Sequence, residues 1–151
     1  MSKESKLARK LRKTSERGSA KLNITPIKKG KIHFRFDYFD ASHIHFDDSE
    51  IDFNWARSML KRLKDLQDTL VEQFRTDMRF RRSQYVHPIN WNTAKLDSFG
   101  IQNASPDLDD DAWQFAISKD NGRVHGFFIG DFFYIVWIDP EHRLCEHWTP
   151  N

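Results

Sequence analysis

Alternating apolar and polar residues predict a first strand over residues 32–39. Ile32, Phe34, Phe36 and Tyr38 are separated by single, mostly polar residues, which is a period of two. A period of two places these four side chains on one face of a strand. We expect that face to pack against the core.

A helical spacing follows over residues 50–79. Its apolar residues recur every three or four positions, at Trp55, Met59, Leu63, Leu66 and Leu70. Ser49 followed by Asp52 is close to a capping box, and Thr69 with Glu72 forms a true one. The helix is therefore predicted to break and restart near residue 69, as a helical hairpin or one kinked helix.

The C-terminal third predicts an antiparallel meander of three strands, over residues 113–117, 123–129 and 132–138. Asn121-Gly122 is a strong hairpin signal, and Pro140 ends the last strand because proline cannot continue a ladder. That strand is apolar on both faces. We therefore expect it to be central, or covered on its second face by residues 80–112.

The order of these elements predicts an α+β domain over residues 32–151. It would be a four-stranded, mainly antiparallel sheet (β-α-α-β-β-β) with a helical hairpin packed on one face.

A strict period of two places Tyr134 and Trp137 on opposite faces of the last strand. Pro88 forces His87 towards extended geometry and argues against helix at that point.

The charge of the chain is unevenly distributed. Residues 1–31 contain 11 basic and two acidic residues, a net charge of +9, whereas residues 32–151 carry a net charge of −7. We interpret residues 1–31 as a basic, flexible N-terminal arm, because they offer little apolar area to bury. A basic arm favours a polyanionic partner such as RNA.

Several classes of protein are disfavoured by the same composition. No apolar stretch approaches the roughly 20 residues of a membrane span, and no secretory signal is apparent, so we expect no membrane partner. The single Cys145 excludes an intrachain disulfide, which favours the cytoplasm.

Three residues near the meander suit the cleavage of RNA through its 2′-hydroxyl. That reaction needs a base, a cation on the phosphate and an acid for the leaving oxygen. Arg123 and His125 are two apart on a strand and share a face, and His142 follows the next strand. Histidine suits proton transfer and arginine suits phosphate. His33 and Arg35 alternate in the same way and could complete the basic face, and no metal or other cofactor is needed.

The segment WQFAISKDNGRVHGFFIGDFFYIVWIDPEHRL, together with the element order, resembles the RelE/ParE toxin superfamily. The resemblance implies a toxin that cuts mRNA at the ribosome and is neutralised by an antitoxin protein. It implies that Arg123 meets the scissile phosphate and that His142 or Arg143 is the general acid or a second phosphate ligand. The chain is also similar to uncharacterised bacterial and mobile-element proteins with HPINW-like stretches.

Basic residues of the arm and body are candidates for nucleic-acid binding. They are Lys6, Arg9, Lys10, Arg12, Lys13, Arg17, Lys28, Lys29, Lys31, Arg81, Arg82 and Arg143. The rival hypothesis is a non-catalytic phage or plasmid accessory protein that binds nucleic acid through its arm and a protein through its sheet. Under that hypothesis Arg123 is only solvated or paired with a carboxylate, and His125 is a partly buried structural histidine bonded to backbone.

Overall fold

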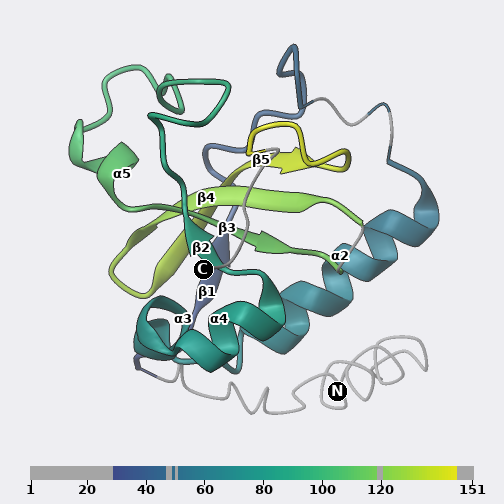
Figure 1. Cartoon of the computed structure of the whole chain (residues 1–151), viewed down its shortest axis with the longest axis vertical. Helices are drawn as coiled ribbons and strands as arrows, with labels where there is room; N and C mark the ends of the chain where they lie inside the picture. Colours follow the sequence, from purple (N-terminus) through teal and green to yellow (C-terminus); the bar gives the residue numbers. More distant parts are fainter. Residues whose placement is uncertain (1–28, 47–48, 50, 119–120, 146–151) are drawn as a thin grey trace, which may run out of the picture.

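The computed structural model describes residues 29–46, 49, 51–118 and 121–145 (Figure 1). The elements are β1 (His33–Arg35), α2 (Phe53–Leu66), α3 (Val71–Thr76), α4 (Met78–Gln84), β2 (His87–Pro88), α5 (Asp107–Asp110), β3 (Ala112–Ala116), β4 (Arg123–Ile129) and β5 (Phe132–Asp139). The predicted α+β class is confirmed. Most of the predicted basic arm, residues 1–28, lies outside the described residues. None of the helices described is long and apolar enough to cross a membrane.

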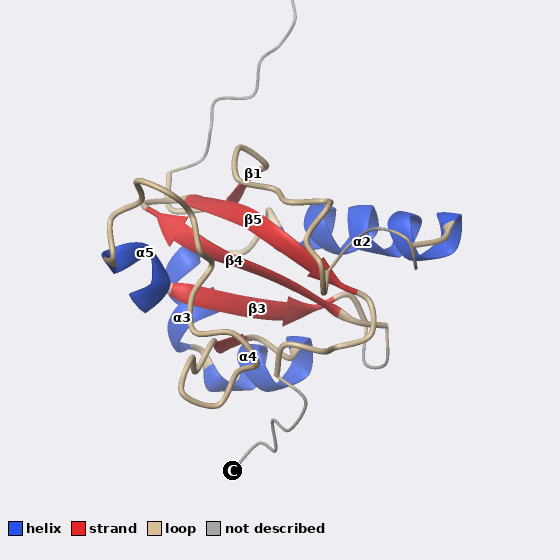
Figure 2. Cartoon of the chain, turned by 90° about the horizontal axis from the view of Figure 1, so that it is seen from above, coloured by secondary structure: helices blue, strands red, loops and turns tan. Residues whose placement is uncertain are grey.

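The sheet has five strands in the order β1-β5-β4-β3-β2 (Figure 2). The predicted mainly antiparallel sheet is present, with three antiparallel strand pairs, but it differs in detail: β2 makes it five strands rather than four, and β1 runs parallel to β5. Strand β2 exists because His87 and Pro88 pair with Gln114 and Trp113. Proline is tolerated there because β2 is an edge strand.

Helices α2, α3 and α4 cover one face of the sheet, which we call the helix face (Figures 1 and 2). The buried apolar side chains on this face are Ile32, Leu63, Leu66, Phe74, Val86, Trp113, Phe115, Ile117, Val124, Phe128, Phe133, Ile135 and Ile138. The predicted core residues Trp55 and Met59 pack against them from α2. Leu70 is exposed, contrary to the predicted helical stripe.

The predicted break between helices is confirmed, but its cause is not the predicted capping box. The N–H of Ile32 donates to the carbonyl of Thr69 at 3.1 Å, and that of Val71 donates to the carbonyl of Gly30 at 2.8 Å. This pairing with the chain before β1 keeps residues 69–70 out of the helices, and Leu70, the N-cap of α3, makes no side-chain capping bond. At the start of α2 the cap is Asp52, whose carboxylate accepts from the backbone N–H of Trp55 at 2.7 Å.

Loops cover the second face, which we call the loop face. Its buried apolar side chains are Phe46, Ile89, Phe99, Ala112, Phe127, Val136, Trp137 and Leu144. Strand β5 lies between β1 and β4 and is covered on both faces. The expectation that residues 80–112 cover its second face is confirmed.

A register shift in β5 corrects one prediction. His125 pairs with Trp137 and the next residue, Gly126, pairs with Ile135, so Val136 is an extra residue in the ladder. A bulge of this kind interrupts the period of two. As a result Tyr134 and Trp137 both pack on the loop face, rather than on opposite faces.

Strand β1 is shorter than predicted. It ends at Arg35, and the backbone N–H of Phe39 donates to the carbonyl of Phe36 at 3.0 Å, which closes a turn. Ile32 is buried as expected, but Phe36 and Tyr38 are exposed.

Candidate functional site

A row of polar side chains crosses four strands on the loop face. His87 pairs across the sheet with Gln114, Gln114 with His125, and Arg123 with Asp139. All five are buried, and Gln114 and His125 are completely inaccessible to solvent. We call His87, Gln114, Arg123, His125 and Asp139 the polar row. Buried titratable groups that cluster in this way are candidates for a functional site.

The centre of the row is an ion pair between His125 and Asp139. The Nε2 of His125 lies 3.1 Å from the Oδ2 of Asp139. Burial by itself would raise the pKa of Asp139. The hydrogen bond and charge of His125, together with the backbone N–H groups of Arg143 and Leu144, outweigh burial and lower that pKa. Asp139 is therefore a carboxylate at neutral pH.

Asp139 also holds the turn that follows β5. Its Oδ1 accepts from the backbone N–H of Arg143 at 2.8 Å, and its Oδ2 accepts from that of Leu144 at 3.0 Å. Its main-chain carbonyl accepts from the N–H of His142 at 3.2 Å. The ion pair thus fixes residues 139–144, which we call the tail turn. It holds His142 with a left-handed backbone, at φ 55°.

The pKa of His87 is shifted by its burial and by the charged groups around it. Burial lowers its pKa to about 4, the Pro88 carbonyl opposes this, and the positive charges of His125, Arg123 and His142 lower it further. The Nδ1 of His87 donates to the Pro88 carbonyl at 2.9 Å, which leaves its Nε2 to accept from the side-chain amide of Gln114. His87 is therefore neutral at pH 7.

Contacts with Gly122 and Tyr85 hold the Arg123 side chain at the end of the sheet where Asp139 lies. Its Nη1 donates to the carbonyl of Gly122 at 3.0 Å, and its guanidinium lies 5.4 Å from the ring centre of Tyr85. Gly122 has φ +84°, and a Cβ there would come within 2.5 Å of the Asp139 carbonyl oxygen. Glycine therefore allows this hairpin to pack directly on the start of the tail turn.

On neighbouring strands of the row, the Oε1 of Gln114 and the Nδ1 of His125 have no hydrogen-bond partner in the described part of the chain. A buried polar atom without a partner costs free energy, and such atoms often mark functional sites or bound water.

The three residues predicted for catalysis lie at one end of the sheet, with unequal access to solvent. His125 is fully buried and Arg123 is 7 % exposed, whereas His142 on the tail turn is half-buried. His33 and Arg35 do not join them. They pair with Phe132 and Tyr134, at the opposite end of β5 from Asp139.

Sequence reasoning missed His87, Gln114 and Asp139. The sequence patterns predict only that a strand ends at Pro140, next to Asp139, and that Pro88 excludes helix at His87. A carboxylate at the end of an apolar strand, facing a histidine on the preceding strand, was the available signal. Gln114 offered no signal, because its importance comes from its cross-strand neighbours.

The candidate nucleic-acid residues divide into three groups. Lys6, Arg9, Lys10, Arg12, Lys13, Arg17 and Lys28 lie outside the described residues. Lys29 and Arg82 are exposed. The others make contacts: Lys31 with Asp68 at 3.1 Å, Arg81 with the Val86 carbonyl and the Trp113 ring, and Arg143 with Glu141.

Cys145 follows the tail turn but is not an activated thiol. Burial raises its pKa to about 11, and the charge of Asp139 raises it in the same direction. The thiolate, which is the nucleophilic form, is scarce at neutral pH.

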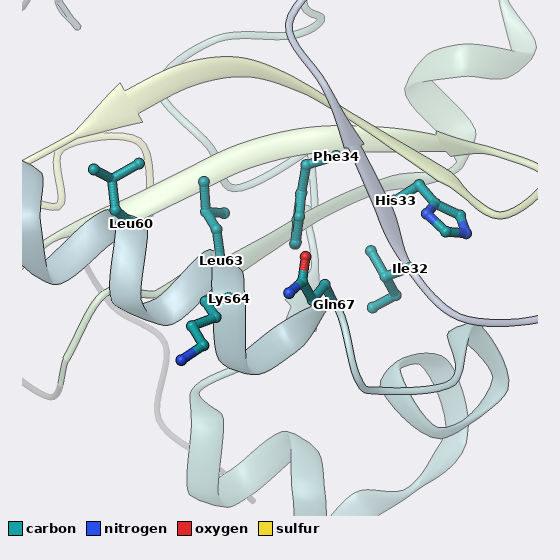
Figure 3. A pocket seen from close by; sticks show the side chains of 7 residues that line it. All are labelled: Ile32, His33, Phe34, Leu60, Leu63, Lys64 and Gln67. Carbon is teal, nitrogen blue, oxygen red and sulfur yellow. The ribbon is translucent and has the colours of Figure 1, made fainter. Parts of the chain in front are cut away.

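A pocket of about 420 Å³ lies away from the polar row, between β1 and α2. Figure 3 shows Leu63 of this helix and Gln67, just after its C-terminal end, opposite Phe34 of β1 and Ile32, which precedes that strand. Its lining contains only one fixed charge, Lys64, so its chemistry does not resemble that of the polar row.

The chain was compared with known proteins in three ways. No protein-family model, no curated protein and no solved structure matches it.

Proposed function

We propose that this chain is a metal-independent endoribonuclease, a toxin of the RelE/ParE kind that cuts mRNA at the ribosome. The observation that carries the proposal is that Arg123, His125 and His142 gather around Asp139: Arg123 pairs with it across the strands, the His125 ring bonds to its carboxylate, and the His142 N–H donates to its carbonyl. These are the residue types that transesterification through a 2′-hydroxyl requires.

The differences in burial assign different roles to these residues. His142 is the least buried of the three, so we assign it the proton transfer, as base on the 2′-hydroxyl or acid on the leaving 5′-oxygen; its Nε2 is buried, and the tail turn must move to expose that atom. Arg123 supplies the cation for the phosphate as negative charge develops. His125 is inaccessible, so it is a positioning residue, which with Asp139 holds the tail turn in place.

The uneven charge of the chain supports RNA as the substrate. The +9 of residues 1–31 would attract phosphate, and the −7 of the remainder would keep RNA from binding indiscriminately elsewhere. A protein antitoxin is the partner that such a toxin requires.

A second candidate function is a non-catalytic module that binds nucleic acid and protein. The burial of Arg123 and His125 favours it, because neither side chain touches a ligand without movement of its surroundings. Under this alternative the polar row only stabilises the end of the sheet.

The experiment that separates the two functions is incubation of the purified full chain with mRNA in EDTA, with and without ribosomes. We expect fragments with 2′,3′-cyclic phosphate and 5′-hydroxyl ends, because the 2′-oxygen attacks phosphorus and the 5′-oxygen leaves with a proton. RNA that is bound but stays intact under both conditions would favour the binding module.

A further inference from the structure

The turn after β1 exposes three aromatic side chains. Phe36, Tyr38 and Phe39 have 49, 41 and 36 % of their surface exposed. We call these three rings and the adjacent Arg35 the aromatic platform. Large apolar side chains normally bury, and a contiguous exposed group of them indicates an interaction site.

The backbone of the aromatic platform is fixed to the sheet. The N–H of Phe39 donates to the carbonyl of Phe36 at 3.0 Å, and that of Asp40 donates to the carbonyl of Val136 at 2.9 Å. The rings of Phe36 and Phe39 meet edge to face, with centres 6.2 Å apart. The rings are therefore in place before any ligand arrives, which lowers the entropic cost of binding.

Two side chains of the aromatic platform pack against aromatic rings of β4 and β5. The Tyr38 ring lies 5.5 Å from the Tyr134 ring and 5.6 Å from that of Phe127. The Arg35 guanidinium lies 5.8 Å from the centre of the Tyr134 ring and is oriented by two hydrogen bonds to Asp37, at 2.7 and 2.8 Å. A cation and exposed rings thus share one rigid surface.

We propose that the aromatic platform stacks the unpaired bases of single-stranded RNA. Exposed rings beside an arginine are the combination that binds single strands without sequence preference, since every base has a face that can stack. The basic arm supports this choice of ligand, because Lys28, Lys29 and Lys31 lie four to seven residues before Arg35 in the chain. The proposal deepens the proposed function, on which it rests for the identity of the nucleic acid.

Tyr38 and Arg35 of the platform lie on the same face as the polar row, because they contact Phe127 and Tyr134. Tyr134 precedes Asp139 by five residues on β5, a separation of roughly 16 Å at the rise of a strand. Residues 40–46 follow β5 between the two places: Asp40 bonds to Val136, and the His43 ring lies 4.8 Å from that of Trp137. One RNA strand can therefore contact the platform while its backbone reaches the tail turn.

The test is the affinity of the full chain for a fluorescent 2′-O-methyl oligonucleotide of about ten residues, a length within the usual range of such sites. The 2′-O-methyl group prevents cleavage. Phe36→Ala and Phe39→Ala should each weaken binding roughly tenfold, the typical effect of losing one stacking ring. Phe39→Leu, which keeps an apolar side chain without a ring, should weaken it similarly.

Two controls identify base stacking as the cause. Phe53 is 80 % exposed on α2, so Phe53→Ala is a matched loss of a surface ring and should leave affinity unchanged. An abasic oligonucleotide with the same phosphates should bind parent and platform variants equally. Equal affinity of the platform variants and the parent for the base-containing strand would overturn the proposal. So would an equal loss with the abasic strand. Unchanged RNA binding with a change in oligomeric state would overturn it too, and would assign the surface to a protein contact.

The same samples separate this proposal from the proposed function. If the parent never cleaves RNA but Phe36→Ala and Phe39→Ala weaken oligonucleotide binding, the platform is supported and the ribonuclease assignment fails. If the parent cleaves RNA while the platform variants bind and cleave like the parent, the ribonuclease stands and the platform is wrong.

Discussion

The two faces of one sheet bury different chemistry. The helix face is filled by aliphatic and aromatic side chains around Phe74. The loop face carries His87, Gln114, Arg123, His125 and Asp139, which are five of the six buried polar or charged residues in the described part of the chain. Side chains on both faces are shielded from water. Almost all of the buried polar and charged side chains that are described lie on the loop face.

This difference indicates that the helix face supplies stability, whereas the loop face holds the candidate functional groups. Apolar burial stabilises a fold in proportion to the area removed from water. A buried ion pair contributes little net stability, because desolvation offsets the attraction between its charges. The helix face is therefore expected to supply most of the stability, and the loop face to hold its charged groups in a fixed geometry.

The largest effect is expected from a charge placed in the apolar part of the loop face. Val136 is 2 % exposed and is the extra residue of the bulge in β5. Val136→Asp would bury an unpaired carboxylate among aromatic side chains and should prevent folding. Circular dichroism and thermal melting measure this directly. A soluble variant that melts cooperatively near the parent temperature would show that the loop face tolerates charge anywhere.

Matched truncations compare the two apolar cores. Phe74 is fully buried between the helices and the sheet, whereas Phe99 is buried beneath a loop. Phe74→Ala should cost about 3–5 kcal/mol of unfolding free energy. Phe99→Ala should cost about 1 kcal/mol less, because a loop collapses into a cavity more easily than packed helices do. Urea unfolding of both variants provides the test, and the opposite ranking would contradict the assignment of stability to the helix face.

Acid should weaken the loop face through His87. Its folded pKa of about 4 lies below the ordinary 6.5, so the unfolded chain binds a proton between these values and the folded chain does not. Stability should therefore fall by about 3 kcal/mol as pH drops from 6.5 to 4, and this loss should level off below 4. The lowered pKa of Asp139 adds stability that is present above its unfolded value and is lost as pH falls through its folded value.

The urea midpoints at pH 7 and at pH 4.5 measure this loss of stability with acidification. His87→Gln removes the titrating group, so the variant should be less stable at pH 7 but should lose less on acidification. Equal losses in parent and variant would show that His87 is not the group responsible.

Local patterns predicted the elements, and the errors arose where distant residues pair. Alternation and Asn121-Gly122 sufficed for the three C-terminal strands, and helical spacing sufficed for α2. Strand β2 was missed because two residues carry no periodicity, and only the pairing of His87 with Gln114 makes them a strand. The bulge at Val136 was missed because nothing in an apolar run marks the extra residue.

The candidate site was predicted in part for the same reason. Arg123, His125 and His142 could be proposed from residue type and position along the meander. Their burial could not, because it depends on loops from residues 40–46 and 89–111 that fold over the face. Nothing in the sequence around Arg123 indicates that its side chain is buried. Its burial against Tyr85 means that Arg123→Ala should also lower the melting temperature.

The most direct test of the account is the rate of RNA cleavage by His142→Asn relative to the parent and His45→Asn. Asparagine tolerates the left-handed backbone at residue 142, so the fold should persist. His45 is an exposed histidine that is not a member of the polar row, and it is the matched control. The account predicts that His142→Asn cleaves about 10²–10⁴-fold more slowly with an unchanged melting temperature, while His45→Asn matches the parent. A folded His142→Asn protein that cleaves RNA as fast as the parent would contradict the assignment of the tail turn as the ribonuclease site.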